Sequence, residues 1–256
     1  MILCLNMGNT NMTGGVFDGP TLKFDFRHRS FPHISRDELG LFLQGVLTAH
    51  GVKPRDIRQI AACSVLPEAT YSLHNACKAY FSTEPFMIRT GIRTGLKIRY
   101  RNPQEVGADR IANAIAALHH YPNQNLIVVN FATATTLCAI GADKTYHGGA
   151  IVPGVRTSLS ALVSCAAKLS SVEILPVHQV LGRSTAESMQ AGMYYGHMGM
   201  VREILYRMKN EAFGSSVATV IGTGEFSPLF NDSGLLDKTC PALPLEGLYL
   251  ALKMNS

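Results

Sequence analysis

Two apolar runs that end in small and hydroxyl residues constrain the fold of this chain more than any other feature. The first covers residues 1–5, ends in the turn Asn6-Met-Gly-Asn-Thr-Asn11, and is followed by a second apolar run that ends near Gly19. This pattern predicts a β-hairpin. Glycine lets the backbone approach a ligand, and successive N–H groups can hold an anion such as phosphate. Taken alone, however, such a turn is most often an ordinary hairpin turn.

The same arrangement recurs about half a chain later. An apolar run over residues 125–129 ends at Asn130 and continues through Thr133 into a further apolar segment. Such self-similarity predicts two halves built from one supersecondary unit, each presenting a phosphate-binding hairpin to a shared cleft. We therefore expect an α/β protein of two duplicated lobes, residues 1–120 and residues 121–256, with a cleft between them.

The composition is that of a compact globular protein. Of the 256 residues, 46% are hydrophobic and 16% are charged, which excludes a disordered chain. No apolar run reaches the roughly 18 residues of a membrane span, and the first run has no signal-peptide character. Cys4 and Cys138 fall in expected strands, which indicates buried thiols and a reducing compartment. We expect a soluble, cytoplasmic protein with no membrane partner.

The charge distribution and the motifs narrow the function. The net charge of +5 comes from scattered Arg and Lys residues, without the basic stripe that is typical of nucleic-acid binding. The nine histidines show no zinc-ligand spacing, and the chain has no GxSxG, Walker A or GxGxxG motif. Nucleic-acid, zinc, hydrolase and Rossmann dehydrogenase functions are therefore disfavoured.

Outside the hairpins, strand patterns alternate with helix patterns, which favours an α/β fold. A capping box of Ser35 and Glu38 predicts the start of one helix, and Ser184 and Glu187 predict the start of a long one. Residues 148–154 are expected to form a constrained turn. The remaining expected strands span residues 22–27, 57–65, 86–88, 96–98 and 217–221. The remaining expected helices span residues 69–81, 155–168 and 245–254, and one more begins after residue 110.

Three local features leave alternatives open. Asp109 lies at a loop-to-helix junction, where its carboxylate could simply interact with the helix N-terminus, worth about 0.3–1 kcal/mol. It could instead act as a general base that accepts a proton from a hydroxyl nucleophile. Gly192 and Gly196 in the long helix could pack against another helix of the chain, which we favour, or form a dimer face. The turn Thr223-Gly224-Glu225 could approach the adenosine end of a nucleotide.

Seven sequence blocks together resemble type III pantothenate kinases, which belong to the acetate-kinase/hexokinase/actin superfamily. The blocks span nearly the whole chain in the family's order: Gly8-Asn9-Thr10, Ser64-Val-Leu-Pro67, Gly107-Ala-Asp-Arg110, Thr133-Ala-Thr135, Gly148-Gly149 with Pro153-Gly154, Thr185, and Thr223-Gly224. The resemblance implies ribonuclease H-like lobes. It also implies ATP-dependent phosphorylation of pantothenate to 4'-phosphopantothenate, the first step of coenzyme A biosynthesis.

The resemblance further implies roles for individual residues, with Asp109 as the catalytic base. ATP would be bound by Asn6, Gly8, Asn9, Thr10, Asn11, Thr13 and Thr133. Pantothenate would be bound by Tyr100, Gly107, Ala108, Asp109, Arg110 and Thr185. Arg110 could pair with the pantothenate carboxylate or brace its own loop. Members of the family are homodimers that use Mg²⁺ and a monovalent cation, K⁺ or NH₄⁺.

The chain departs from the family at four positions. Asn6 stands where the family has an aspartate that serves the Mg²⁺-phosphate region, and Asn130 where it has an aspartate that serves the monovalent cation. Asparagine lacks the negative charge, and hard cations favour anionic oxygen ligands. Ala132 and Glu225 stand where glycines are usual. We favour a pantothenate kinase, and the four departures leave open whether its activity is full or weakened. The alternatives are a non-catalytic paralogue that binds pantothenate, a nucleotide or a protein in regulation, and a different small-molecule kinase of the superfamily.

Overall fold

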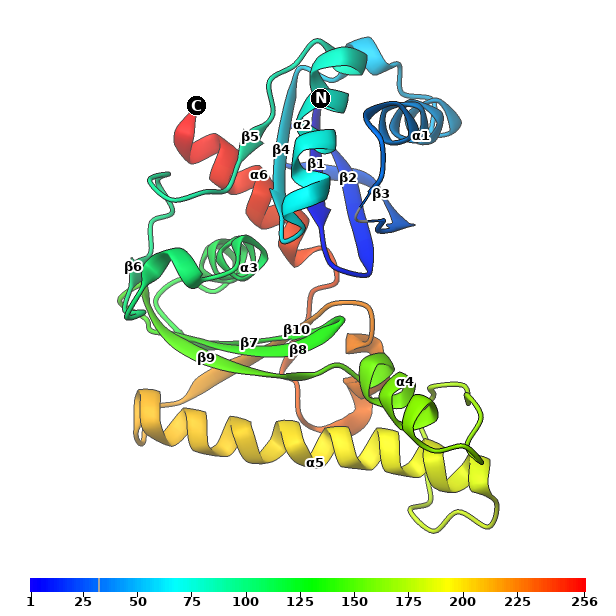
Figure 1. Ribbon diagram of the computed structural model, residues 1–256. Helices are drawn as coiled ribbons and strands as arrows, with labels where there is room; N and C mark the ends of the chain where they lie inside the picture. Colours follow the sequence, from blue (N-terminus) through cyan, green and yellow to red (C-terminus); the bar gives the residue numbers. More distant parts are fainter. Residues whose placement is uncertain (32) are drawn as a thin grey trace. The chain divides into compact units, whose positions relative to one another are not determined.

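The computed structural model describes residues 1–31 and 33–256 (Figure 1). The chain divides by its internal contacts into two units. The first unit comprises Met1–Gly95, Asn102–Ala116 and Ala242–Ser256, and the second comprises Leu96–Arg101 and Ala117–Pro241. The end of the chain therefore belongs to the same unit as its beginning. The lobe boundary between residues 120 and 121 stays a prediction.

The first unit is built on a five-stranded sheet of order β3-β2-β1-β4-β5, in which β1 is antiparallel to β2 and parallel to β4. Its strands are β1 (Ile2–Met7), β2 (Asn11–Asp18), β3 (Thr21–Arg29), β4 (Gln59–Ser64) and β5 (Phe86–Met87). Its helices are α1 (Arg36–Ala49), α2 (Pro67–Phe81), α6 (Leu243–Asn255), the start of α3 (Ala108–His120), and the short 3-10 helices at Pro54–Asp56 and Pro103–Glu105.

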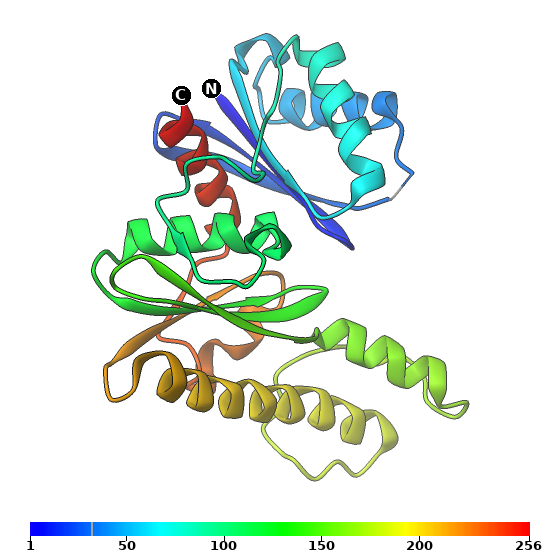
Figure 2. The same cartoon turned by 60° about the vertical axis from the view of Figure 1, so that its left-hand side comes forward.

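The two faces of this sheet carry different layers, because alternate residues of a strand point to opposite faces. Leu3, Leu5 and Met7 of β1 pack in one core with apolar residues of α1 and α2. On the other face, Phe17 of β2 stacks on Tyr249 of α6, with ring centroids 4.9 Å apart. Figure 2 shows α1 and α2 on one side of the sheet and α6 on the other. The even-numbered residues of β1 therefore lie on the α6 side.

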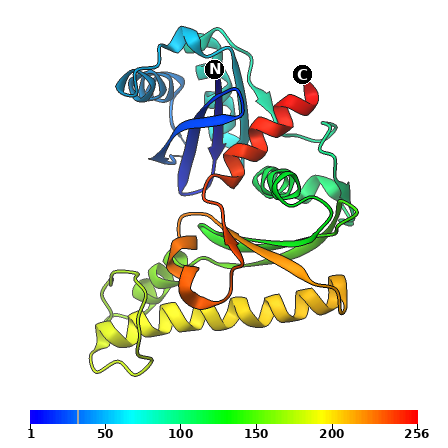
Figure 3. The same ribbon diagram turned by 180° about the vertical axis from the view of Figure 1, so that it is seen from behind.

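The second unit contains a six-stranded sheet of order β11-β10-β7-β8-β9-β6. Its strands are β6 (Lys97–Ile98), β7 (Asn125–Phe131), β8 (Ala134–Ile140), β9 (Thr145–Pro153), β10 (Ala218–Thr223) and β11 (Lys238–Thr239). Its helices are α4 (Val155–Cys165), α5 (Thr185–Phe213) and the 3-10 helix Ser227–Ser233. The long helix α5 runs along this sheet (Figure 3), and its residues Tyr194, Val201 and Leu205 share a core with residues of β7.

The two sheets confirm the predicted duplication. The order β9-β8-β7-β10-β11 repeats the order β3-β2-β1-β4-β5, with β6 added at one edge. The register repeats as well: Asn6 lies between Thr13 and Cys63 in the first sheet, and Asn130 lies between Thr136 and Thr223 in the second. Each asparagine is thus held by a strand on both sides near the end of its own strand.

Two predictions about glycines were wrong. Residues 148–153 are not a constrained turn but part of β9, where Gly148, with φ +133°, lies next to a register shift opposite Ala139 and Ile140. A β-bulge inserts an extra residue into one strand of a pair without ending the strand, and glycine tolerates the positive φ at this one. Gly192 and Gly196 do not pack inside the chain, because no described atom lies within 4 Å of a Cβ added at either position.

The remaining expectations for the elements were confirmed to within a few residues. The thiols of Cys4 and Cys138 are buried, and all six cysteines are free. Within the described residues, none of the helices combines the length and the apolar character that a membrane crossing requires.

Candidate active site

The turn between β1 and β2 presents polar residues on a tightly held backbone. The Gly8 N–H donates to Asn11 O at 3.1 Å, and the Ser30 N–H donates to Thr10 O at 2.8 Å. A Cβ on Gly8 would lie only 2.8 Å from Asn11 O, so the turn needs glycine there. Asn9 and Thr10 at its tip are exposed. The geometry is that of a compact turn whose tip is open to a ligand.

Asn6 lies just before this turn, on the α6 side of the sheet. The Cys63 Sγ donates a hydrogen bond to Asn6 Oδ1 at 3.1 Å. Cys63 is fully buried, and burial raises the pKa of its thiol well above the usual value, with the nearby charge of Asp109 adding to the effect. On the other side of Asn6, the hydroxyl of Thr13 is buried and has no hydrogen-bond partner among the described residues.

Asp109 lies in the first turn of α3. Burial raises the pKa of Asp109 above its usual range, although a hydrogen bond from the Arg110 N–H and the Arg110 charge oppose the shift. The carboxylate folds back over Gly107, where an added Cβ would lie 2.7 Å from Asp109 Oδ1. It therefore does interact with the helix N-terminus, and a raised pKa also suits a general base. Its influence on Cys63 puts Asp109 in the same neighbourhood as Asn6.

The other residues of this loop are held in place by the protein. Arg110 is only 5% exposed, whereas arginine is rarely fully buried unless its charge is paired. Its backbone N–H donates to Gly107 O at 3.0 Å. Gly107 and Ala108 are half-buried. Arg110 is therefore enclosed by the protein at the start of α3.

The turn of the second hairpin, Ala132-Thr133, is held by the start of α4. Thr133 O accepts hydrogen bonds from the Gly154 N–H at 3.0 Å and from Thr157 Oγ1 at 2.6 Å. A Cβ on Gly154 would lie 2.1 Å from Ala132 O, so α4 can begin this close to the turn only with glycine. The backbone of this turn is therefore packed closely against the start of α4.

A third turn meets the side chain of Asn130. Gly224 has φ +90°, and a Cβ there would lie 2.4 Å from Asn130 Oδ1. The neighbouring Thr223 is fully buried, and its hydroxyl has no hydrogen-bond partner among the described residues. Glu225, which follows, forms an ion pair with Arg156 of α4 at 3.5 Å. The negative charge that Glu225 brings to this turn thus faces a positive one.

Tyr100 and Thr185 belong to other parts of the second unit. Tyr100 lies over Gly148, with ring atoms 3.8–4.0 Å from an added Cβ, and its ring centroid is 6.5 Å from that of Tyr146. Thr185 is the exposed first residue of α5, after the N-cap Ser184. Tyr100 is therefore placed over β9, and Thr185 at the start of α5.

Sequence reasoning missed three residues at these turns. The thiol of Cys63 and the guanidinium of Arg156 pair with side chains far away in sequence, and only the strand register or helix placement brings them together. His197 of α5 is 5% exposed, and its Nε2 lies 2.8 Å from Thr135 Oγ1. A lone histidine in a helix carries no pattern that would have identified it.

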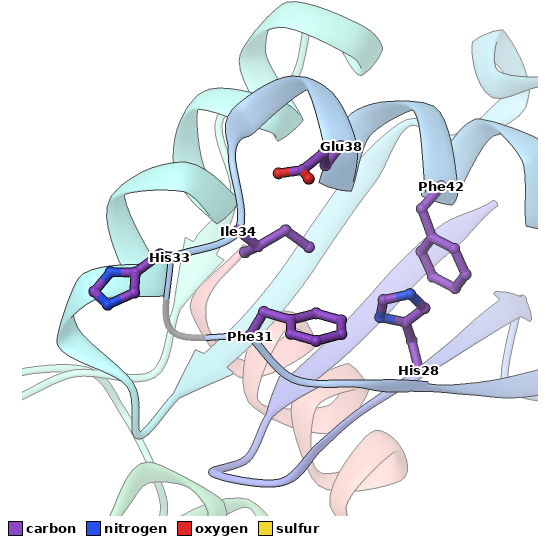
Figure 4. Close-up of a pocket in the computed structure, with 6 residues that line it drawn as sticks. All are labelled: His28, Phe31, His33, Ile34, Glu38 and Phe42. Carbon is purple, nitrogen blue, oxygen red and sulfur yellow. The ribbon is translucent and has the colours of Figure 1, made fainter.

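A cavity of about 460 Å³ in the first unit contains none of the predicted site residues. Figure 4 shows the His28 ring beside Phe42 and Phe31, with centroids 4.0 Å and 6.0 Å apart. The cavity is lined by His28, Phe31, His33, Ile34, Glu38 and Phe42. It is a predominantly aromatic pocket, separate from the polar turns.

The family model and the relatives matched by sequence agree on one family. The family model described as type III pantothenate kinase matches residues 2–207. A type III pantothenate kinase of Legionella pneumophila (strain Corby) is 53% identical over 256 residues, 100% of both chains. That of Elusimicrobium minutum is 46% identical over 255 residues, covering 100% of this chain and 99% of the relative.

Solved structures show the same fold at low identity. A structure described as a Baf family transcriptional activator, from Campylobacter jejuni, has a TM-score of 0.61 at 15% identity and covers 99% of this chain and 98% of its own. An archaeal actin homolog has a TM-score of 0.55 at 14% identity, and the match covers 100% of this chain and 99% of the homolog. These likenesses concern the fold alone, which is the predicted actin-like one.

Proposed function

Because the chain belongs to the type III pantothenate kinase family, we propose that it transfers the γ-phosphoryl group of ATP to the hydroxyl of pantothenate. The product is 4'-phosphopantothenate, in the first step of coenzyme A biosynthesis. The observation that carries the proposal within this chain is Asp109, a carboxylate at the start of α3 with a raised pKa. A pKa raised toward neutrality makes a carboxylate a better general base.

In this proposal, the hydroxyl oxygen of pantothenate attacks the γ-phosphorus of ATP, and Asp109 accepts the proton of that hydroxyl. The bond between that phosphorus and the bridging oxygen breaks, and ADP leaves. The protein mainly positions the groups and neutralises charge. ATP is bound by Asn6, Gly8, Asn9, Thr10, Asn11, Thr13 and Thr133. Pantothenate is bound by Tyr100, Gly107, Ala108, Asp109, Arg110 and Thr185.

The two cations differ in how well the residues suit them. Kinases of this kind use ATP with Mg²⁺, which neutralises charge on the phosphates. Residue 6 does not suit Mg²⁺, because the single side-chain oxygen of Asn6 is neutral and accepts a hydrogen bond from Cys63. Asn130 suits a monovalent cation better, since its side-chain oxygen is neutral and its cross-strand partner Thr223 has a buried hydroxyl with no hydrogen-bond partner among the described residues. We assign K⁺ or NH₄⁺ to Asn130 on this basis.

We also infer that the protein is a homodimer. Gly192, Gly196 and Gly199 form an exposed strip of small residues on α5, and no described atom approaches within 4 Å of a Cβ at these positions. Small residues at this spacing allow a second helix to approach closely. A sedimentation measurement that finds only monomers, at concentrations where the protein is active, would contradict the dimer.

The experiment for the function measures ADP release with ATP, Mg²⁺, K⁺ and pantothenate. It compares the protein with Asp109→Ala and with the double variant Asn6→Asp/Asn130→Asp. Turnover that Asp109→Ala abolishes would establish the kinase. Activity in the double variant alone would identify a kinase disabled at its two hairpins.

If both proteins are silent while calorimetry still detects pantothenate binding, the kinase proposal fails. The chain would then be a regulatory binding protein of the same family. Circular dichroism of each variant checks that the fold is retained, so that silence is not mistaken for unfolding.

A further inference from the structure

The backbone pairing of Asn6 with both neighbouring strands fixes the face of the sheet from which its side chain projects. In the parallel pair with β4 its partner is Cys63, and in the antiparallel pair with β2 its partner is Thr13. Residues paired in this way project from the same face of a sheet. All three side chains therefore lie together on the α6 face, close to the first turn.

The Cys63 thiol sets the orientation of the Asn6 amide group. Cys63 Sγ lies 3.1 Å from Asn6 Oδ1 and is fully buried. A protonated thiol is a hydrogen-bond donor, and in this buried place the thiol stays protonated because its pKa is raised well above the usual value. A donor selects the oxygen end of an amide, which turns the NH₂ end away from it.

We propose that Asn6 binds the phosphates of ATP as a hydrogen-bond donor, through its NH₂ group, and does not ligate Mg²⁺. Cys63 is the positioning residue that holds the amide in this orientation. The inference rests on the proposed binding of ATP. Amide N–H groups suit phosphate oxygens, whereas Mg²⁺ requires oxygen ligands and prefers anionic ones.

The surroundings of Asn6 agree with an anion as the ligand. The Thr13 hydroxyl beside it is buried and unpartnered among the described residues, and such a group is commonly satisfied by a ligand or its water. The described residues contain no cluster of three His, Cys, Asp or Glu side chains that could hold a metal ion. The carboxylate of Asp109, whose charge acts on Cys63, is folded back onto the start of its own helix.

The test measures binding of the imido analogue of ATP by calorimetry, once with Mg²⁺ and once with EDTA, so that no turnover is needed. The unmodified protein is expected to lose less than about threefold in affinity when Mg²⁺ is removed, whereas Asn6→Asp is expected to lose about tenfold or more. The aspartate gains an anionic oxygen for Mg²⁺ and loses the NH₂ donor. Equal Mg²⁺ dependence of the two proteins would overturn the proposal.

The role of Cys63 is tested separately. Cys63→Val removes the donor at similar size and is expected to weaken binding in EDTA severalfold, because the amide is free to turn. Cys63→Ser keeps a donor and is expected to retain the affinity. Cys77→Val, at a buried cysteine of α2, is the matched control for loss of a buried thiol. Equal affinities of the Val and Ser variants at position 63 would overturn the positioning role.

The outcomes separate this inference from the function. Turnover of pantothenate together with a strong Mg²⁺ dependence of the unmodified protein would overturn the inference and leave the kinase standing. Nucleotide binding with the expected pattern but without turnover would support the inference and remove the kinase. No nucleotide binding by any folded variant would overturn both.

Discussion

His197 predicts that acid destabilises the second unit. His197 is 5% exposed and forms a hydrogen bond with the side chain of Thr135. Its ring lies against the rings of Phe131 and Phe230, at centroid distances of 6.3 Å and 5.9 Å. Burial lowers the pKa of His197 to about 4. A histidine in an unfolded chain titrates near 6.5. Folding therefore favours the neutral form.

The size of the effect follows from these two pKa values. Above about pH 6.5 the residue is neutral in both states and costs nothing. As the pH falls from about 6.5 to about 4, the unfolded chain binds a proton that the folded chain does not, so stability is lost; below that range the loss levels off. Between about pH 7 and about pH 5 the loss amounts to ~2 kcal/mol.

The assay is urea unfolding followed by circular dichroism, for the protein and for His197→Gln. Glutamine can still bond to Thr135 but does not titrate, and all other titrating groups are common to both proteins. The difference in unfolding free energy between them should change by ~2 kcal/mol from about pH 7 to about pH 5, with the unmodified protein losing more. His178→Gln, at an exposed histidine, controls for the replacement of a histidine by glutamine. Parallel pH curves for the protein and His197→Gln would refute the reasoning.

Two further predictions concern packing and charge. Gly247→Ala should destabilise the protein by at least ~2 kcal/mol, because a Cβ would lie 1.9 Å from Ala112 O. Gly45→Ala on α1 should instead stabilise the protein by ~0.5–1 kcal/mol, because no described atom lies within 4 Å of a Cβ added there. Thermal unfolding of both variants tests this, and equal changes in stability for the two would contradict the reasoning. Glu225→Gln should lower the KM for ATP about fivefold at low salt and less at high salt, whereas the exposed Glu211→Gln should not. An unchanged KM would show that the carboxylate lies outside the reach of the nucleotide.

The local elements were predictable because their signals lie within a few residues. The Ser35 hydroxyl accepts from the Glu38 N–H and the Glu38 carboxylate accepts from the Ser35 N–H, as the capping box predicts. At α5 only half of the box forms, since Glu187 accepts from the Arg183 N–H instead of from Ser184. The duplicated hairpins were predictable for the same reason, and they led to the correct fold.

The contacts that give the turns their chemistry were not predictable in this way. The pairing of Cys63 with Asn6 depends on the register between β1 and β4, strands that are separated in the sequence by β2, β3, α1 and a 3-10 helix. The ion pair of Arg156 with Glu225 depends on where α4 starts, which the close approach of Gly154 to Ala132 sets. Membership of α6 in the first unit is likewise a long-range property.

These contacts also show that the two asparagines are not equivalent, although they occupy matching positions in the two sheets. The oxygen of Asn6 is engaged by a buried thiol, and an aspartate there would add a second carboxylate near Asp109, which would raise the pKa of that base further. The oxygen of Asn130 lies against the backbone of Gly224, next to a turn whose own carboxylate, Glu225, is already paired with Arg156. Replacing asparagine by aspartate therefore changes the proposed base at one position and the proposed cation site at the other. The single variants Asn6→Asp and Asn130→Asp must consequently be measured separately before the double variant can be interpreted.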